Sequence, residues 1–115
     1  MEHDRETEIF ELQADVCLAL ANPKRLQILS LLKDGEMPVS QMLKGIDVNK
    51  ANISQHLSIL KQKGLLLSRR EGTAVYYRLS SPRITEACGA MREVLLETLR
   101  AKERLSKNMQ ETAAA

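Results

Sequence analysis

A short amphipathic segment near residues 50–62 carries the side chains best suited to recognition chemistry. Ile53, Leu57 and Leu60 recur at spacings of four and three, which predicts a helix with a narrow apolar stripe. The opposite face presents Lys50, Asn52, Ser54, Gln55 and Ser58. Amide side chains can pair with adenine edges, and lysine can reach guanine or a phosphate. The segment is therefore either a helix that reads a DNA groove or an ordinary polar surface helix.

A basic segment follows this helix directly. Residues 65–70 and 74–79 are two short extended runs, and Glu71-Gly72-Thr73 forms the turn between them. This pattern predicts a β-hairpin in which Gly72 is free to adopt a positive φ. The predicted hairpin carries Arg69, Arg70 and Arg78, and cations at such a place suit the phosphates that flank a groove. The hairpin therefore favours DNA binding.

Three helices are expected to position these two elements. The first carries an apolar stripe and ends before Pro23, and Asn22 with Pro23 forms the cap and first position of the second. The second ends near residues 34–35, and a short third helix spans about 39–44. Residues 47–49 are a tight connection, with Asn49 as the cap of the segment near 50–62. The stripe of the first helix consists of Ile9, Leu12, Val16, Cys17 and Leu20.

A last helix is expected after the hairpin. Ser81 caps it, Pro82 lies just inside it, and its apolar stripe runs from Ile84 to Leu99. The fold class is therefore mainly α with a small β-hairpin, in the order α-α-α-α-β-β-α. We expect a single domain over residues 1–105, whose first and last helices form the dimer contact, and a disordered tail over 106–115.

Composition and charge limit the possible functions. The 115 residues match the length of one domain, and the 3% aromatic content favours a helical core. The acidic, polar start and the lack of a long apolar run predict a cytoplasmic protein that spans no membrane. Residues 1–22 carry six acidic residues and one basic residue, whereas residues 23–80 carry ten basic and four acidic residues. A basic centre is a weak indication of phosphate binding.

Three runs of sequence resemble the ArsR/SmtB family of bacterial transcriptional regulators. Residues 19–29 (ALANPKRLQIL) are similar to the family's opening motif, residues 52–65 (NISQHLSILKQKGL) to its recognition segment and residues 69–79 (RREGTAVYYRL) to its wing. The likeness extends over about residues 14–100. It implies a winged helix-turn-helix fold and a homodimer, joined mainly by the first and last helices, that binds operator DNA and represses transcription until a small inducer binds.

The predicted DNA-binding residues come from the recognition segment and the wing. His56 could be a metal ligand or a base contact, but the family carries histidine there in metal-binding and other members alike, so we expect a structural or DNA-backbone role. The full predicted set is Lys50, Asn52, Ser54, Gln55, His56, Ser58, Lys61, Arg69, Arg70, Thr73 and Arg78.

The metal sites of metal-sensing relatives are not expected in this chain. One family site uses a Cys-x-Cys run at the start of the third helix, where residues 36–42 contain no thiol. Another uses carboxylate and histidine ligands on the last helix. The matching positions are about Ser81, Arg83, Val94 and Glu97, and three of these four cannot bind zinc in that way. We therefore predict no metal and no cofactor.

Cys17 and Cys88 leave three interpretations open. Both lie on apolar stripes, so they could be plain packing residues. They could instead sense oxidants or persulfides, because the resemblance places their helices at the dimer contact. A soft ion such as As(III) or Cd(II) would also choose thiolates, although usually three of them.

Two other classes of function are disfavoured. An enzyme would need a Cys-x-x-Cys pair, an activated thiolate, a glycine-rich phosphate loop or a zinc-hydrolase motif, and none appears. A pure protein-interaction module fits poorly with a polar helix followed by a basic hairpin. Salt-dependent binding to a duplex separates these classes from a DNA-binding protein.

Overall fold

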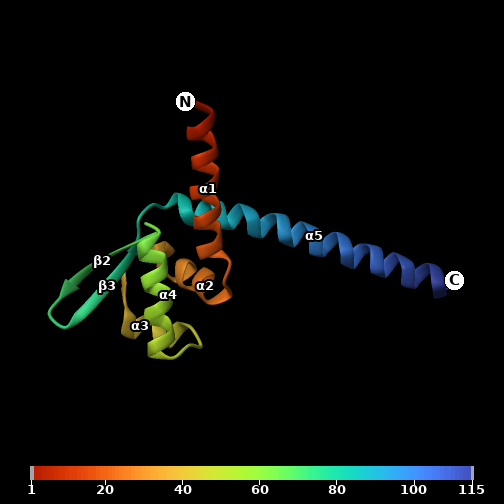
Figure 1. The fold of residues 1–115 in the computed structure, drawn as a ribbon. Helices are drawn as coiled ribbons and strands as arrows, with labels where there is room; N and C mark the ends of the chain where they lie inside the picture. Colours follow the sequence, from red (N-terminus) through yellow and green to blue (C-terminus); the bar gives the residue numbers. More distant parts are fainter. Residues whose placement is uncertain (1, 115) are drawn as a thin grey trace. The chain divides into compact units, whose positions relative to one another are not determined.

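The computed structural model describes residues 2–114, and the side chains of residues 4–113. Figure 1 shows the chain as helices with one projecting hairpin, which confirms the predicted fold class. The elements are α1 (Glu2–Leu20), α2 (Pro23–Leu31), the 3-10 turn η1 (Leu32–Asp34), β1 (Met37–Pro38), α3 (Val39–Gly45), α4 (Lys50–Gln62), β2 (Leu66–Glu71), β3 (Ala74–Leu79) and α5 (Arg83–Ala114).

Two asparagines begin the helices that matter most for the site, as predicted. The Asn22 side chain accepts hydrogen bonds from the backbone N–H groups of Lys24 and Arg25, at 2.9 and 3.2 Å. The Asn49 side chain accepts from the backbone N–H of Asn52 at 2.8 Å. Each cap satisfies donors that the first helical turn leaves unpaired, and it fixes the residue at which the helix starts.

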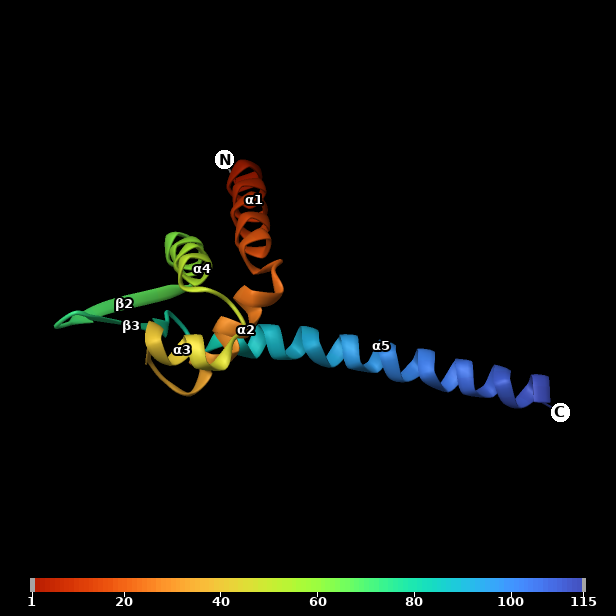
Figure 2. The same cartoon turned by 90° about the horizontal axis from the view of Figure 1, so that it is seen from below.

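The sheet contains one strand that the sequence did not predict. Strands β2 and β3 form the expected antiparallel hairpin, and Gly72 in its turn has φ +61°. The additional strand is β1, which pairs antiparallel with β3 through Met37–Tyr77 and Pro38–Tyr76, so that the order is β1-β3-β2. Figure 2 shows the β2–β3 hairpin extending away from α3 and α4.

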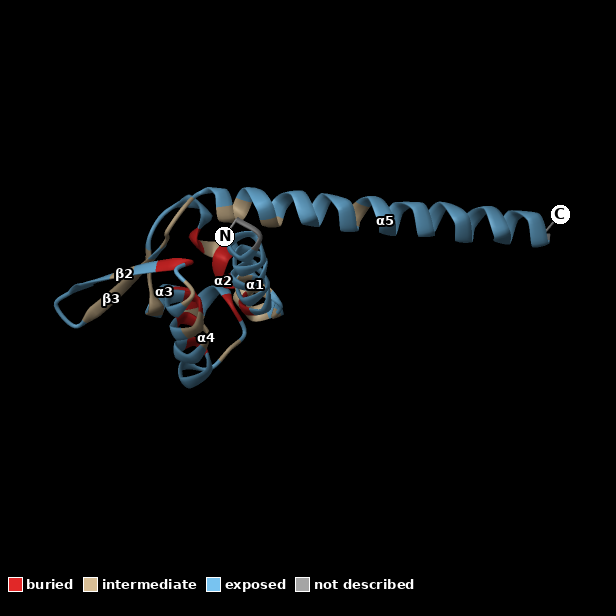
Figure 3. Cartoon of the chain, turned by 45° about the horizontal axis from the view of Figure 1, so that its top comes forward, coloured by how far each residue is buried: buried red, intermediate tan, exposed pale blue. Residues whose placement is uncertain are grey.

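The core joins α2, α3, α4 and the start of β2. Ile28, Met42, Ile53, Leu60 and Leu66 are at most 1% exposed, and Figure 3 shows the buried positions gathered on these elements. Most of the apolar residues of α1 and α5 lie outside this core. Among the exposed large hydrophobic residues, Ile9, Phe10, Leu12 and Leu18 belong to α1, and Met91, Val94, Leu95, Leu99, Leu105 and Met109 belong to α5.

The chain divides into two compact units, with the boundary between Ile84 and Thr85. The second unit consists of α5 from Thr85 onwards, and the helix continues through Ala114, whereas the sequence predicted a disordered tail over 106–115. Residues 100–113 contain neither glycine nor proline and are rich in strong helix formers, so no residue there ends the helix. Residue 115 lies outside the described part. None of the described helices is long and apolar enough to cross a membrane.

Candidate nucleic-acid interface

The outward face of α4 is set by what the helix buries. Ile53, Leu57 and Leu60 are 0, 1 and 0% exposed, so they fix the rotation of α4 against the core. Side chains on the other side must point to solvent because the helix period is 3.6 residues. The structure brings these predicted positions together on one exposed surface: Lys50, Asn52, Ser54, Gln55 and Ser58.

Most of these polar side chains have unused hydrogen-bonding groups. Among the described residues, the side chains of Asn52, Gln55 and Ser58 form no hydrogen bond within the chain. The Ser54 hydroxyl is the exception, because it donates to the Lys50 carbonyl at 3.0 Å. Free amide groups can donate and accept at once, which is what pairing with an adenine edge requires.

His56 lies at the edge of this surface and is half-buried. Its Nδ1 atom is buried without a hydrogen-bond partner in the described structure, as is Nε of Arg25 on α2. Burial lowers the pKa of His56, and the positive charge of Arg25 lowers it further. Both effects favour the neutral form of His56. Its predicted structural or backbone role stays a prediction.

Arg69 on the hairpin is held by two carboxylates. Its Nε donates to Glu36 Oε2 and Oε1 at 2.9 and 3.1 Å, its Nη2 also contacts Glu36, and its Nη1 donates to Glu71 at 2.7 Å. The guanidinium carbon lies 4.5 Å from the centre of the Tyr76 ring. The hydrogen bonds that Arg69 donates to Glu36 lower the pKa of Glu36 and raise the pKa of Arg69.

The other predicted cations are arranged differently. Arg70 and Arg78 are exposed, and no ion pair or hydrogen bond engages their side chains among the described residues. Lys61 donates to the Ser68 hydroxyl at 2.7 Å, which ties the end of α4 to β2. Thr73 lies exposed in the hairpin turn. Glu36 is the residue that sequence reasoning missed, because β1 was not predicted.

A short helix, a tight connection, an exposed polar helix and a projecting hairpin define a winged helix-turn-helix protein. Comparison with known proteins agrees with this class. Residues 22–68 match the family model described as "Bacterial regulatory protein, arsR family". The chain belongs to the ArsR family of transcriptional regulators.

Relatives at the level of sequence and structure support this assignment. The HTH-type transcriptional regulator Rv0081 of Mycobacterium tuberculosis is 33% identical over 92 residues, which cover 79% of this chain and 81% of the relative. The homodimeric winged helix-turn-helix DNA-binding domain of Mycobacterium bovis Mb0332 is 38% identical with a TM-score of 0.75, covering 84% of this chain and 89% of that one. The transcriptional repressor BigR of Xylella fastidiosa is 26% identical with a TM-score of 0.69, covering 82% and 95%.

We predict that His56 makes folding stability depend on pH. Because its pKa in the folded chain lies below the usual 6.5, the unfolded chain takes up this proton first, and protonation favours unfolding. The contribution of His56 is complete above pH 6.5 and falls as the pH drops towards the lowered pKa. Urea denaturation at pH 8, 7, 6 and 5.5 should show a smaller loss of stability for His56→Gln than for wild type. Parallel pH profiles for the two proteins would contradict a lowered pKa of His56.

Proposed function

We propose that this regulator is a homodimeric, sequence-specific DNA-binding repressor of the cytoplasm. The observation that carries the proposal is α4, which buries Ile53, Leu57 and Leu60 and exposes polar side chains, two lysines and one alanine but no acidic residue. A B-DNA major groove is about 12 Å wide and admits one helix of this kind. The β2–β3 hairpin would then lie along the flanking backbone.

The proposed contacts divide into base and backbone contacts. Asn52 and Gln55 supply amides for adenine edges, and Lys50 can reach guanine or phosphate. Arg70 and Arg78 are exposed cations on the hairpin and suit phosphates, which position a protein without reading sequence. The smaller or partly engaged groups that complete the proposed surface are Ser54, His56, Ser58, Lys61 and Thr73.

We expect base and phosphate contacts to respond differently to substitution. Gln55→Ala should weaken specific binding by about 1–3 kcal/mol, because a base contact is lost. Arg70→Ala should weaken binding to every duplex and reduce the salt slope by about one unit. Gel shifts with DNA upstream of the protein's own gene and with random duplexes, over a range of salt, measure both effects.

Gln110→Ala is the matched control, because Gln110 is an exposed glutamine near the end of α5. It should leave binding unchanged. If Gln55→Ala weakens random and specific duplexes equally, α4 is not the reading helix.

Repression is the direction of regulation that we propose. The similar protein BigR of Xylella fastidiosa is a transcriptional repressor, which supports this direction. A protein bound over a promoter blocks polymerase when the site overlaps the start of transcription. Transcription in vitro from the upstream DNA should fall as the protein is added, and a rise would contradict repression.

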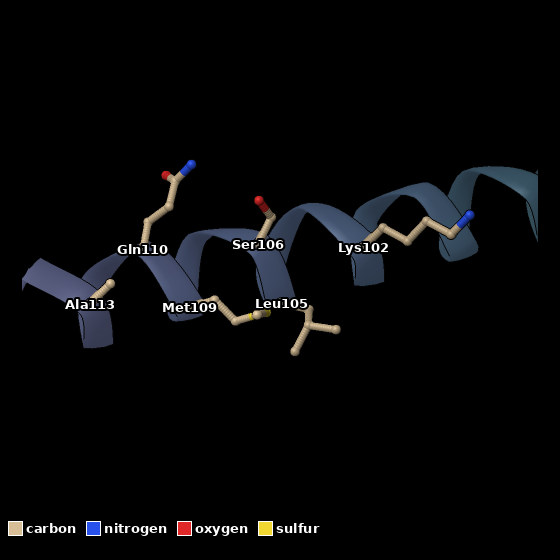
Figure 4. Close-up of a pocket in the computed structure, with 6 residues that line it drawn as sticks. All are labelled: Lys102, Leu105, Ser106, Met109, Gln110 and Ala113. Atoms are coloured by element: carbon tan, nitrogen blue, oxygen red, sulfur yellow. The ribbon is translucent and has the colours of Figure 1, made fainter.

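The proposed dimer uses the apolar faces of α1 and α5. Met91 and Leu95 are 70 and 55% exposed in the single chain, and solvent exposure of several such side chains is unfavourable. The face continues beyond Leu99, because Leu105 and Met109 point to the same side of α5 (Figure 4). The similar Mycobacterium bovis domain is homodimeric, which supports the same state for this chain.

We predict that Leu95→Asp produces a monomer at micromolar concentration, because a charge would be buried on the apolar face. Glu97→Lys is the control, since two residues along a helix turn the side chain by about 200° and place it on the opposite face. Sedimentation velocity measures both variants against wild type. A wild-type protein that is monomeric at micromolar concentration would contradict the proposed dimer.

We propose Cys17 and Cys88 as the sensing residues. Both are free thiols in the described structure; Cys17 is exposed and Cys88 is half-buried. Exposure makes Cys17 a poor candidate for plain core packing, although a dimer contact would cover it. A bridge between thiols imposes Cα separations of roughly 4.4–6.8 Å and would bias the packing of the helices that carry them.

The soft-metal alternative uses the same residues. Among the described residues, no group of three or more histidine, cysteine or carboxylate side chains is arranged to hold a metal. As(III) or Cd(II) would therefore need thiolates from two chains. Purely structural cysteines are the remaining alternative, and the same experiment decides among the three.

We predict that thiol chemistry releases the protein from DNA. A dimer reads half-sites about 34–36 Å apart, so a small change at the dimer contact displaces both α4 helices. Diamide or polysulfide should lower the DNA affinity of wild type but not of Cys88→Ser, with Cys17→Ser showing whether one thiol suffices. As(III) tests the metal alternative in parallel. If wild type keeps full affinity with every reagent, the inducer does not act through these thiols.

A further inference from the structure

The bridge between Arg69 and Glu36 joins the hairpin to the helix-turn-helix motif. We propose that this pair is a latch that holds the β2–β3 hairpin in place beside α3, so that Arg69 positions the wing rather than binding a DNA phosphate. The inference rests on the proposed DNA-binding function. It changes the role that the sequence predicted for Arg69, and it assigns a role to Glu36.

Only the two residues of β1 separate Glu36 from the helix-turn-helix motif. It directly precedes β1 (Met37–Pro38), and α3 begins at the next residue, Val39. Pro38 is the N-cap of α3 and also pairs with Tyr76 of β3. A carboxylate at residue 36 therefore moves with the start of α3, and whatever it binds is fixed relative to that helix.

Arg69 is fixed on the hairpin side. Its partner in the β2–β3 ladder is Tyr76, and its guanidinium stacks on that ring. Alternate residues of a strand point to opposite faces. Pro38, Arg69 and Tyr76 therefore share one face of the sheet. Since Glu36 lies two residues before Pro38, it falls on the same face and can reach the guanidinium.

The hydrogen bonds of Arg69 leave little for a phosphate. Nε and Nη2 contact Glu36, and Nη1 contacts Glu71. Three of the five N–H donors of the guanidinium are thus engaged, so a phosphate would compete with two carboxylates that are already bound. Glu36 and Glu71 offset the charge of Arg69 and of Arg78, which also acts on Glu36, so this face of the hairpin offers a phosphate no net positive charge. Arg70, in contrast, is exposed and unpaired in the described structure.

The decisive variant is Glu36→Gln, because the two roles of Arg69 predict opposite results. Loss of the latch should weaken operator affinity roughly fivefold, the upper range for an exposed ion pair. It should do so even though removing an anion near DNA would by itself strengthen binding. The alternative is that Arg69 binds a DNA phosphate and that Glu36 only offsets its charge. In that case Glu36→Gln should tighten DNA binding and steepen the salt slope by about one unit.

Two further variants isolate the latch from net charge. Glu71→Gln makes the same change of charge but leaves the Glu36 pair intact, so affinity should stay constant or rise slightly. Arg69→Lys keeps the charge and loses the fork, so it should weaken binding as Glu36→Gln does. The double variant Glu36→Gln/Arg69→Lys should be no weaker than either single variant, because both remove one interaction.

Hydrogen exchange of the DNA-free protein tests the latch without reference to DNA. Amides of residues 69–76 should exchange faster in Glu36→Gln than in wild type, while those of α4 are unchanged. Unchanged exchange in the hairpin overturns the latch, and so does tighter DNA binding by Glu36→Gln. If neither wild type nor any variant binds DNA, the proposed function fails, and hydrogen exchange alone decides the latch.

Discussion

The complete burial of one side of α4 is the constraint on which the rest of the site depends. Ile53, Leu57 and Leu60 lose nearly all contact with water, and burial of each such side chain contributes about 1.5–3 kcal/mol. Rotating α4 by even a third of a turn would expose them. The outward face is thus defined without any contribution from its own residues. The side chains of Asn52 and Gln55 form no hydrogen bond within the described chain, so their amide groups are unused in the fold.

The second constraint is the small strand β1. A hairpin attached only through its own two ends would be held less firmly against α3 and α4. Pairing of Met37 with Tyr77 joins β3 to the segment that begins α3, and the donation from Lys61 to Ser68 joins α4 to β2. Both helices of the recognition motif are therefore connected to the hairpin, one through the backbone and one through a side chain.

Local signals predicted most of the fold. Asn22 and Asn49 cap their helices, Gly72 takes the positive φ that the turn requires, and the 53-57-60 spacing marks the buried face. These signals work because each depends on residues close in sequence. Strand β1 has two residues, one of them proline, so it shows no alternation and exists only because β3 lies beside it. The contact between Glu36 and Arg69 spans 33 residues and follows from that pairing.

Contacts between residues far apart in sequence also change the net charge of the hairpin. Counting along the sequence gives the hairpin three cations at Arg69, Arg70 and Arg78, and such a count treats Glu36 as part of a distant loop. In the folded chain Glu36 and Glu71 both contact Arg69, so its charge is more than compensated within a few ångströms. The charge of Arg78 also acts on Glu36 and lowers the pKa of that carboxyl, so Arg70 is the hairpin cation that no carboxylate offsets in the described structure. The number of basic residues in a wing therefore overstates its attraction for DNA whenever the sheet brings acidic residues onto the same face.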